Sequence, residues 1–148
     1  MSVKLLALFI AAVSGVAMAV QGTMNAALGK IIGLLEATLV VHLAGLILAG
    51  VMLFGLQLGT ISMPKLSQAP WYLYLGGLIG VAIIYGVARS IPKVGVAPAT
   101  TAIILGQVFT ASLIDHFGLL GMQQMQFTWH RVVGILLMAG GAWLLLKK

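Results

Sequence analysis

Long apolar runs alternate along the chain with short breaks that carry its charged residues. The charge-free runs extend from Leu5 to Gly29, Ala37 to Pro64, Gln68 to Ala88, Val94 to Ile114 and Val132 to Leu146. A helix of about 20 apolar residues is long enough to cross the hydrocarbon core of a bilayer. The pattern therefore predicts five transmembrane helices, at about residues 3–26, 33–58, 70–89, 95–115 and 128–146.

Several positions mark the ends of these helices. The second apolar run is longer than one span needs, so we expect its helix to end near Leu58 and residues 59–64 to form a turn. Pro98 either begins the fourth helix or kinks it. Trp129 and Trp143 bracket the fifth helix, as aromatic residues do at the two membrane interfaces.

The composition leaves no room for a domain outside the membrane. The chain has 148 residues, of which 61% are hydrophobic and only 7% are charged. Soluble domains carry about 25% charged residues, so these few charges cannot cover a water-exposed surface. We expect an all-α integral membrane protein in which residues 1–148 form a single five-helix domain.

The charges indicate a membrane partner rather than a nucleic acid. The net charge is +6, but the basic residues are scattered between apolar runs and form no basic face. The chain has no cysteine, which excludes disulfides and cysteine-based metal or redox sites. We expect no metal and no cofactor.

The first apolar run has an alternative interpretation. Lys4, the apolar stretch after it and Ala17-Met18-Ala19 resemble a signal peptide with its cleavage site. The apolar run continues past this site to Gly29, however, so a first transmembrane helix is the better interpretation.

Basic residues in alternate loops set the orientation of a membrane protein. One side of the membrane receives Lys4, Lys65 and Arg131, and the other receives Lys30, Arg89, Lys93, Lys147 and Lys148. The difference weakly favours an outside N-terminus and an inside C-terminus. So small a bias is also compatible with insertion in both orientations.

Polar side chains in the first predicted helix follow one face. Ser14, Gln21 and Asn25 lie on a shared stripe at helical spacing. Polar groups inside a membrane usually face the bundle interior or a cavity, so these residues are candidates for a substrate cavity. The alternative is that they hydrogen-bond neighbouring helices and hold the bundle together.

The second predicted helix carries two titratable candidates for ion coupling. Glu36 is the one acid near the interior of a span, and His42 lies deeper on a face shared with Thr38. Either Glu36 or His42 is suited to carry a proton, and Thr38 and His42 are further candidates for the substrate cavity. Alternatively, Glu36 lies at the interface near Lys30, and His42 is a buried residue with its hydrogen bonds satisfied.

The fourth predicted helix carries a second polar stripe. Thr100, Gln107 and Thr110 share it, and we expect it to meet the first stripe around one cavity. Asp115 at the end of this helix and Arg131 at the start of the next are candidates for a structural ion pair across the intervening loop.

The polar positions carry no catalytic pattern. The sequence has no phosphate-binding Gly-Lys loop, no paired-histidine metalloprotease helix and no recognisable Ser/His/Asp motif. We therefore expect a protein that is not an enzyme.

Taken together, the motifs resemble those of a known membrane family. They are Ser14-Gly15, Gln21-Gly22-Thr23-Met24-Asn25, Leu28-Gly29, Glu36-Ala37-Thr38, His42, Gly76-Gly77, Gly80, Gly106-Gln107, Ile114-Asp115-His116-Phe117-Gly118, Arg131, Gly134 and Gly140. From the first helix to the last, the chain resembles the YdcZ-like family of the drug/metabolite transporter superfamily.

The resemblance implies a five-helix half-transporter of the bacterial inner membrane that spans it several times. The family includes single genes of dual topology, paired genes of opposite orientation and fused ten-helix forms, and its members are generally named exporters. The chain lacks the acid in the first helix that the related small multidrug resistance proteins use for proton exchange. By this resemblance, any coupling residue lies elsewhere, with Glu36 and His42 the first choices.

The sequence thus favours a secondary exporter of a small organic metabolite or drug. Secondary transporters place their substrate between inverted repeats, and an antiparallel homodimer would supply the half that five helices lack. We expect alternating access, with proton coupling, and the lipid bilayer and a small-molecule substrate as further partners. The alternatives are a small dual-topology ion channel and a subunit that needs a different partner chain.

Overall fold

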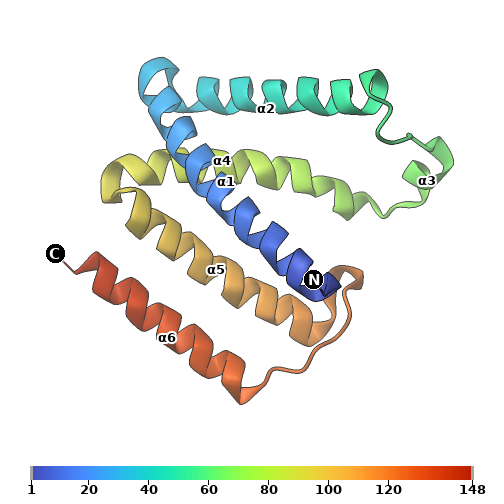
Figure 1. Ribbon diagram of the computed structural model, residues 1–148. Coiled ribbons are helices and arrows are strands. Elements are labelled where there is room, and N and C mark those ends of the chain that lie inside the picture. Colours follow the sequence, from blue (N-terminus) through green and yellow to red (C-terminus); the bar gives the residue numbers. More distant parts are fainter. Residues whose placement is uncertain (1, 148) are drawn as a thin grey trace. The chain divides into compact units, whose positions relative to one another are not determined.

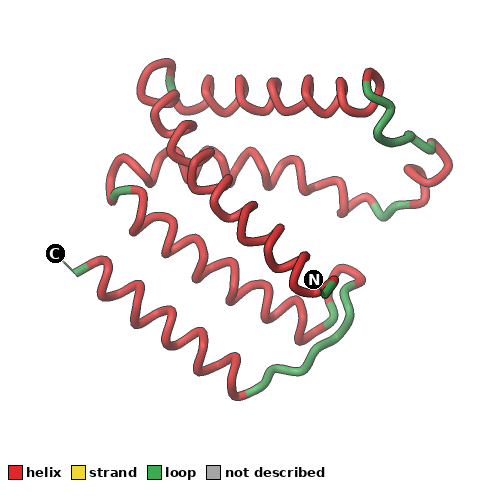
Figure 2. Tube along the Cα trace, in the orientation of Figure 1, coloured by secondary structure: helices red, strands yellow, loops and turns green. Residues whose placement is uncertain are grey.

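The computed structural model describes residues 2–147, which form helices and loops and no strand (Figures 1 and 2). The long helices are α1 (Val3–Ile32), α2 (Leu34–Gly50), α4 (Gly76–Val94), α5 (Val96–Phe117) and α6 (Trp129–Leu146). A π-helical turn at Val51–Gly55 extends α2, a short helix α3 spans Met63–Gln68, and 3-10 turns cover Trp71–Leu75 and Leu119–Gly121. Within residues 2–147, five helical segments are long and apolar enough to span a membrane, which confirms the predicted fold class.

Helix boundaries differ from the prediction at three places. α4 continues to Val94, five residues past the predicted end at Arg89, and contains Pro92. α1 continues to Ile32 and therefore includes Lys30 in its last turn, where a basic side chain suits the negative end of the helix dipole. The second span ends at Gly55, three residues before Leu58, and the predicted turn contains the start of α3.

Pro98 begins its helix and does not kink it. It is the third residue of α5, within the first turn, where a proline costs no helical hydrogen bond. The Ala99 N–H donates to the Gly95 carbonyl at 3.2 Å and closes that turn.

The chain forms two compact units, one up to Lys93 and one from Val94 onward. In the first unit, α1 and α2 pack against each other as a hairpin. In the second, α5 and α6 form an antiparallel hairpin (Figure 1).

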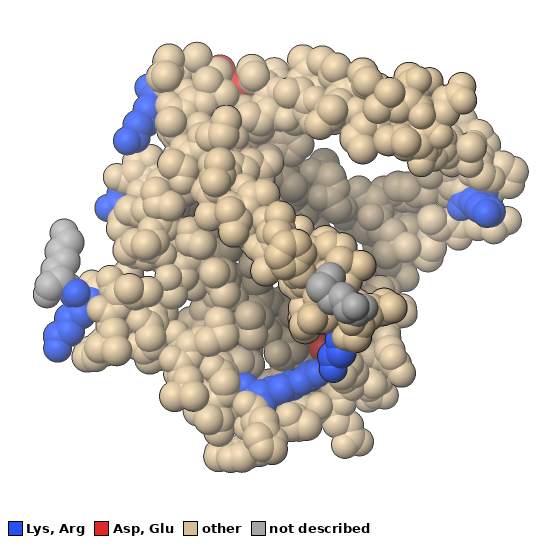
Figure 3. Space-filling view, in the orientation of Figure 1, with Lys and Arg blue, Asp and Glu red and all other residues tan. Residues whose placement is uncertain are grey.

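Small residues are buried, and large apolar residues face outward. The buried apolar residues in the described part of the chain are Ala26, Ala37, Ala88, Ile91, Ala99 and Ala142. Large side chains such as Phe9, Leu39 and Leu137 are exposed, and most of the face in Figure 3 is uncharged, with Lys and Arg gathered in a few places. A protein with this distribution is suited to lipid, because helices in membranes approach through small residues and lipid covers the large apolar ones.

Candidate functional site

One glycine joins α1 to α2. Gly33 has φ of 102° and ψ of 152°, a backbone conformation that is open essentially only to glycine. Its N–H donates to the Gly29 carbonyl at 3.2 Å, and its own carbonyl accepts from the Ala37 N–H at 3.0 Å. The last turn of α1 and the first turn of α2 are therefore hydrogen-bonded through this single residue.

Glu36 lies beside this joint. It is exposed in the first turn of α2, and its carboxylate occupies the space where a Cβ at Gly33 would be. An acid in the first turn is favourable because the N-terminus of a helix carries partial positive charge. In this position the Glu36 carboxylate is suited to stabilise the N-terminus of α2, at the edge of the span.

Asn25 is the buried member of the first polar stripe. It is 6% exposed, on the same part of α1 as the buried residues Gly22, Ala26 and Gly29. A Cβ at Gly22 would lie 3.0 Å from Val87 Cγ1 of α4, so α1 approaches α4 closely here. Within residues 2–147 the structure shows no hydrogen bond from the Asn25 carboxamide, which leaves its donors and acceptor available for a ligand.

The other two members of this stripe face out of the chain. Gln21 is exposed, and Ser14 is exposed with its hydroxyl donating to the Ile10 carbonyl at 2.9 Å. Ser14 therefore satisfies its hydroxyl within its own helix. Gln21 has no such local partner in the described chain and needs one from outside it when the helix is in a membrane.

His42 has one occupied and one free ring nitrogen. Nδ1 lies 2.8 Å from the Thr38 carbonyl, and because a carbonyl only accepts, Nδ1 carries the proton. The Thr38 hydroxyl donates to the Leu34 carbonyl at 2.7 Å. Nε2 lies 3.6 Å from the position that a Cβ at Gly80 of α4 would take, and it makes no hydrogen bond in the part of the chain described. The ring of His42 thus presents a free acceptor toward α4.

The second polar stripe lies in the other unit. Thr100 is half-buried, whereas Gln107 and Thr110 are exposed. Ser112 is a buried polar residue that was not predicted from the sequence; it is 8% exposed and donates to the Val108 carbonyl at 2.8 Å. Ser112 does not share the helix face of the second polar stripe, and a single serine among apolar residues does not indicate a buried polar position. A cavity shared by the two stripes stays a prediction.

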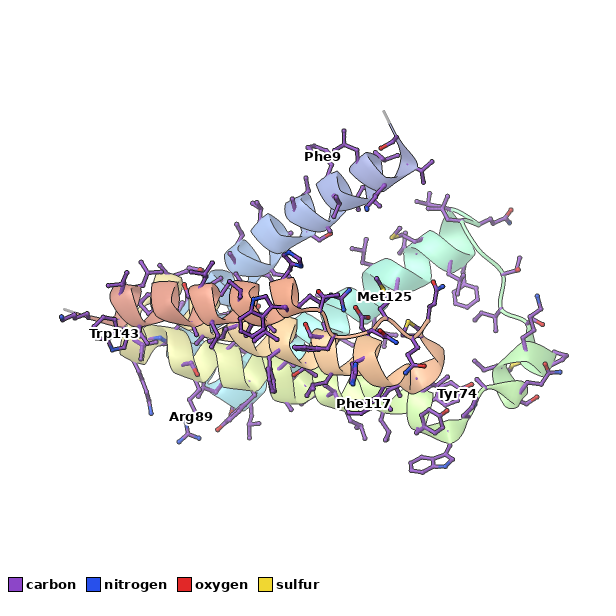
Figure 4. All side chains as sticks on the ribbon, turned by 90° about the horizontal axis from the view of Figure 1, so that it is seen from below. Phe9, Tyr74, Arg89, Phe117, Met125 and Trp143 are labelled. Atoms are coloured by element: carbon purple, nitrogen blue, oxygen red, sulfur yellow. The ribbon has the colours of Figure 1, made fainter. Side chains whose placement is uncertain are left out.

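The loop between α5 and α6 is held by several polar contacts. Arg131 Nη1 lies 3.4 Å from Asp115 Oδ2, with both side chains partly exposed. The Met125 N–H donates to the Asp115 carbonyl at 2.7 Å, and the Phe127 N–H donates to His116 Nδ1 at 3.2 Å. Met125 and Phe117 mark this end of the hairpin in Figure 4. The contacts indicate that Asp115 and Arg131 hold the loop in place.

The helices offer no cluster of three or more His, Asp or Glu side chains for a metal ion within the described residues. Two polar groups of the first unit that are available for function are Asn25 and His42: His42 lies beside Gly80 of α4, and Asn25 lies one turn from Gly22, which is close to Val87 of α4. Carboxamide and imidazole groups bind organic ligands by hydrogen bonds, and imidazole can also exchange a proton.

Comparison with known proteins assigns the family. The family model described as "Putative inner membrane exporter, YdcZ" matches residues 6–144. No curated protein and no solved structure matches the chain. The family match includes all five membrane helices, in agreement with the resemblance that the motifs indicate. The chain is a multi-pass membrane protein and belongs to the YdcZ family of inner membrane exporters.

Proposed function

We propose that the chain is one half of a proton-coupled exporter of small organic compounds, and that it works by alternating access as an antiparallel homodimer. The observation that carries the proposal is the free Nε2 of His42. The proposal rests on three steps: a proton site at mid-membrane depth, a place for the ligand, and a second half supplied by another copy.

The depth of His42 suits a coupling site. His42 is eight residues into the membrane segment Leu34–Gly55, or about 12 Å from its start at 1.5 Å per residue. The hydrocarbon core is about 30 Å thick, so the ring lies near its middle. Titratable groups at this depth are typical of proton pathways in transporters. Glu36, which lies exposed at the end of the helix, is the weaker candidate.

Glycine at position 80 leaves space beside the ring. Gly80 places only backbone beside Nε2, since a Cβ there would lie 3.6 Å from this nitrogen. We propose that a proton or a ligand group reaches Nε2 through the space that this missing side chain leaves. Asn25 supplies a second polar group on the side of α1 that faces α4 near Gly22. We assign the ligand to the space beside α4 that Asn25 and His42 border.

A second copy supplies what one chain lacks. Gln21 and Gln107 are exposed on the chain, although carboxamides facing lipid would lose their hydrogen bonds to water. Transporters place their site between inverted repeats, and a second copy in the opposite orientation forms such a pair. The nearly balanced loop charges allow both orientations.

Transport itself is tested in proteoliposomes that hold a cation, a neutral drug or an anion: ethidium, radiolabelled chloramphenicol or fluorescein. We expect saturable efflux of at least one compound, accelerated by an acidic exterior and returned to the basal rate when nigericin collapses the pH gradient. Protein-free liposomes are the control. Flux that rises linearly with concentration would favour a channel, and efflux indifferent to the gradient would contradict proton coupling.

The antiparallel arrangement predicts labelling from both faces of the membrane. The chain has no cysteine, so a cysteine added after the C-terminal lysine is the one reactive thiol. In intact cells, an impermeant maleimide is expected to modify about half of the copies, and the rest after the membrane is opened. A second variant with the cysteine in the α2–α3 loop at Thr60 should give the same division. Complete labelling from one face alone would exclude dual insertion.

A further inference from the structure

The ends of three helices line an open cavity with a basic rim. It has a volume of about 520 Å³ and lies between the C-terminal turns of α1 and α4 and the start of α2. Its rim includes Lys30 from α1 and Arg89 and Lys93 from α4. The volume is within the range of small-molecule sites.

Small residues create this cavity. Ala26 and Gly29 of α1 and Ala88 of α4 line it and are buried, with Ala26 at 3% and Ala88 at 1% exposed. Larger side chains at these three positions would fill the space between the helices. The floor of the cavity is therefore apolar, and its charge is confined to the rim.

The positive charges of the rim are not neutralised by the protein. The chain has two acidic residues; Asp115 pairs with Arg131 in the other unit, and Glu36 is not among the residues that line the cavity. Of the three rim cations, Arg89 makes a hydrogen bond within the described chain: its Nη1 donates to the Tyr85 hydroxyl at 3.3 Å. Figure 4 shows the Arg89 side chain projecting away from its helix.

Membrane orientation and the helix dipole each explain a single basic residue at the end of a helix. They do not explain why three basic residues from two helices line the same cavity. One cation at each C-terminus would meet both needs. Three cations from two helices around one cavity repel each other, and an anion between them would offset that repulsion. Arginine binds phosphate oxygens in a bidentate manner, and lysine adds point charge. The rim thus has the chemistry of a phosphate site.

We propose that this cavity binds the phosphate group of an anionic lipid. The rim lies at helix ends, where the headgroups of a bilayer lie, and the apolar floor can accept the adjoining glycerol and acyl carbons. Basic pockets between membrane helices bind anionic headgroups in this way. The site is separate from His42, and the proposal does not depend on transport.

The test compares two triple variants of the purified chain in neutral detergent. One is Lys30→Gln/Arg89→Gln/Lys93→Gln at the rim, and the control is Lys4→Gln/Lys65→Gln/Lys147→Gln, which removes the same charge elsewhere. Phosphatidylglycerol binding is measured by native mass spectrometry and by the shift in the unfolding temperature. Each rim cation is expected to contribute about fivefold in affinity. The rim variant should therefore bind on the order of 100-fold more weakly, and the control like the wild type.

Three outcomes decide the matter. Equal loss in the two triple variants would mean general charge attraction and would overturn the site. Stabilisation by glycerol 3-phosphate or inorganic phosphate as strong as that by phosphatidylglycerol, and dependent on the same rim, would replace the lipid by a soluble phosphate. If the rim triple variant does not fold, Arg89→Gln alone is used, with Lys65→Gln as its control. An unchanged affinity in Arg89→Gln would then contradict the proposal.

Discussion

A Gly33→Ala substitution is expected to unfold the α1–α2 hairpin at a much lower temperature than the wild type. An alanine at φ of 102° and ψ of 152° is strained, which costs about 1–3 kcal/mol. Its Cβ would also occupy the position of the Glu36 carboxylate, which must move. We expect a total of about 3 kcal/mol, and a fall in the unfolding temperature on the order of 10 °C.

A Gly95→Ala substitution separates the cost of backbone strain from the cost of displacing the Glu36 carboxylate. Gly95 joins α4 to α5 with nearly the same backbone angles, φ 94° and ψ 163°, but a Cβ there would lie 3.6 Å from Pro98 Cδ, an ordinary contact. Gly95→Ala should therefore lose only the stability that backbone strain costs. The double variant Gly33→Ala/Glu36→Ala should recover part of the stability lost in Gly33→Ala and unfold with about the same loss as Gly95→Ala. The measurement is thermal unfolding in detergent.

Gly45→Ala is the matched control for both glycines. Gly45 is in the middle of α2, and a Cβ there meets nothing within 4 Å. Alanine is the better helix former by about 1 kcal/mol, so this variant should be as stable as the wild type or slightly more so. If Gly33→Ala behaves like Gly45→Ala, the joint does not have the conformation described.

The five spans could be predicted from the sequence because charges interrupt the apolar runs, and membrane helices cannot contain many charges. The same rule placed the end of α1 too early. It treats a charge as the end of a helix, whereas Lys30 stays helical in the last turn and extends its charge to the interface. The π-helical turn at Val51–Gly55 has no sequence signal, since it depends on which carbonyl each N–H selects.

Only part of the candidate site could be predicted from the sequence. Helical spacing indicated Asn25 on the first predicted helix and His42 on the second, because helical periodicity relates neighbours three and four residues apart. The basic rim could not be predicted, because Lys30 and Arg89 are far apart in the chain. Their proximity depends on how closely α1 approaches α4 at Gly22, which is a property of packing.

A His42→Gln substitution is expected to uncouple export from the proton gradient. The Nδ1 proton is committed to the Thr38 carbonyl, so an incoming proton binds at Nε2. In the proposed mechanism, a charged imidazolium is costly in the membrane interior, and we therefore expect the release of its proton to be linked to ligand binding or to opening to the other side. Glutamine has a similar shape and hydrogen-bonding capacity but cannot take up a proton.

Two measurements on the same proteoliposomes distinguish coupling from folding. Efflux driven by a pH gradient should fall at least tenfold in His42→Gln, to the rate seen with nigericin. Exchange of labelled for unlabelled compound at equal pH on both sides should continue, and its rate should no longer depend on pH. His130→Gln is the matched control, because His130 is exposed in the first turn of α6. It should retain the response to the gradient.

His42→Asn tests the role of the occupied nitrogen. An asparagine amide can still donate to the Thr38 carbonyl in place of Nδ1, but it has no group at the position of Nε2. If protonation at Nε2 drives export, asparagine and glutamine must fail in the same way, with exchange intact and the gradient response lost. If exchange and gradient-driven efflux fall together in both variants, His42 serves the packing of α2 beside α4. The proton must then be carried by another group, of which Glu36 is the first to examine.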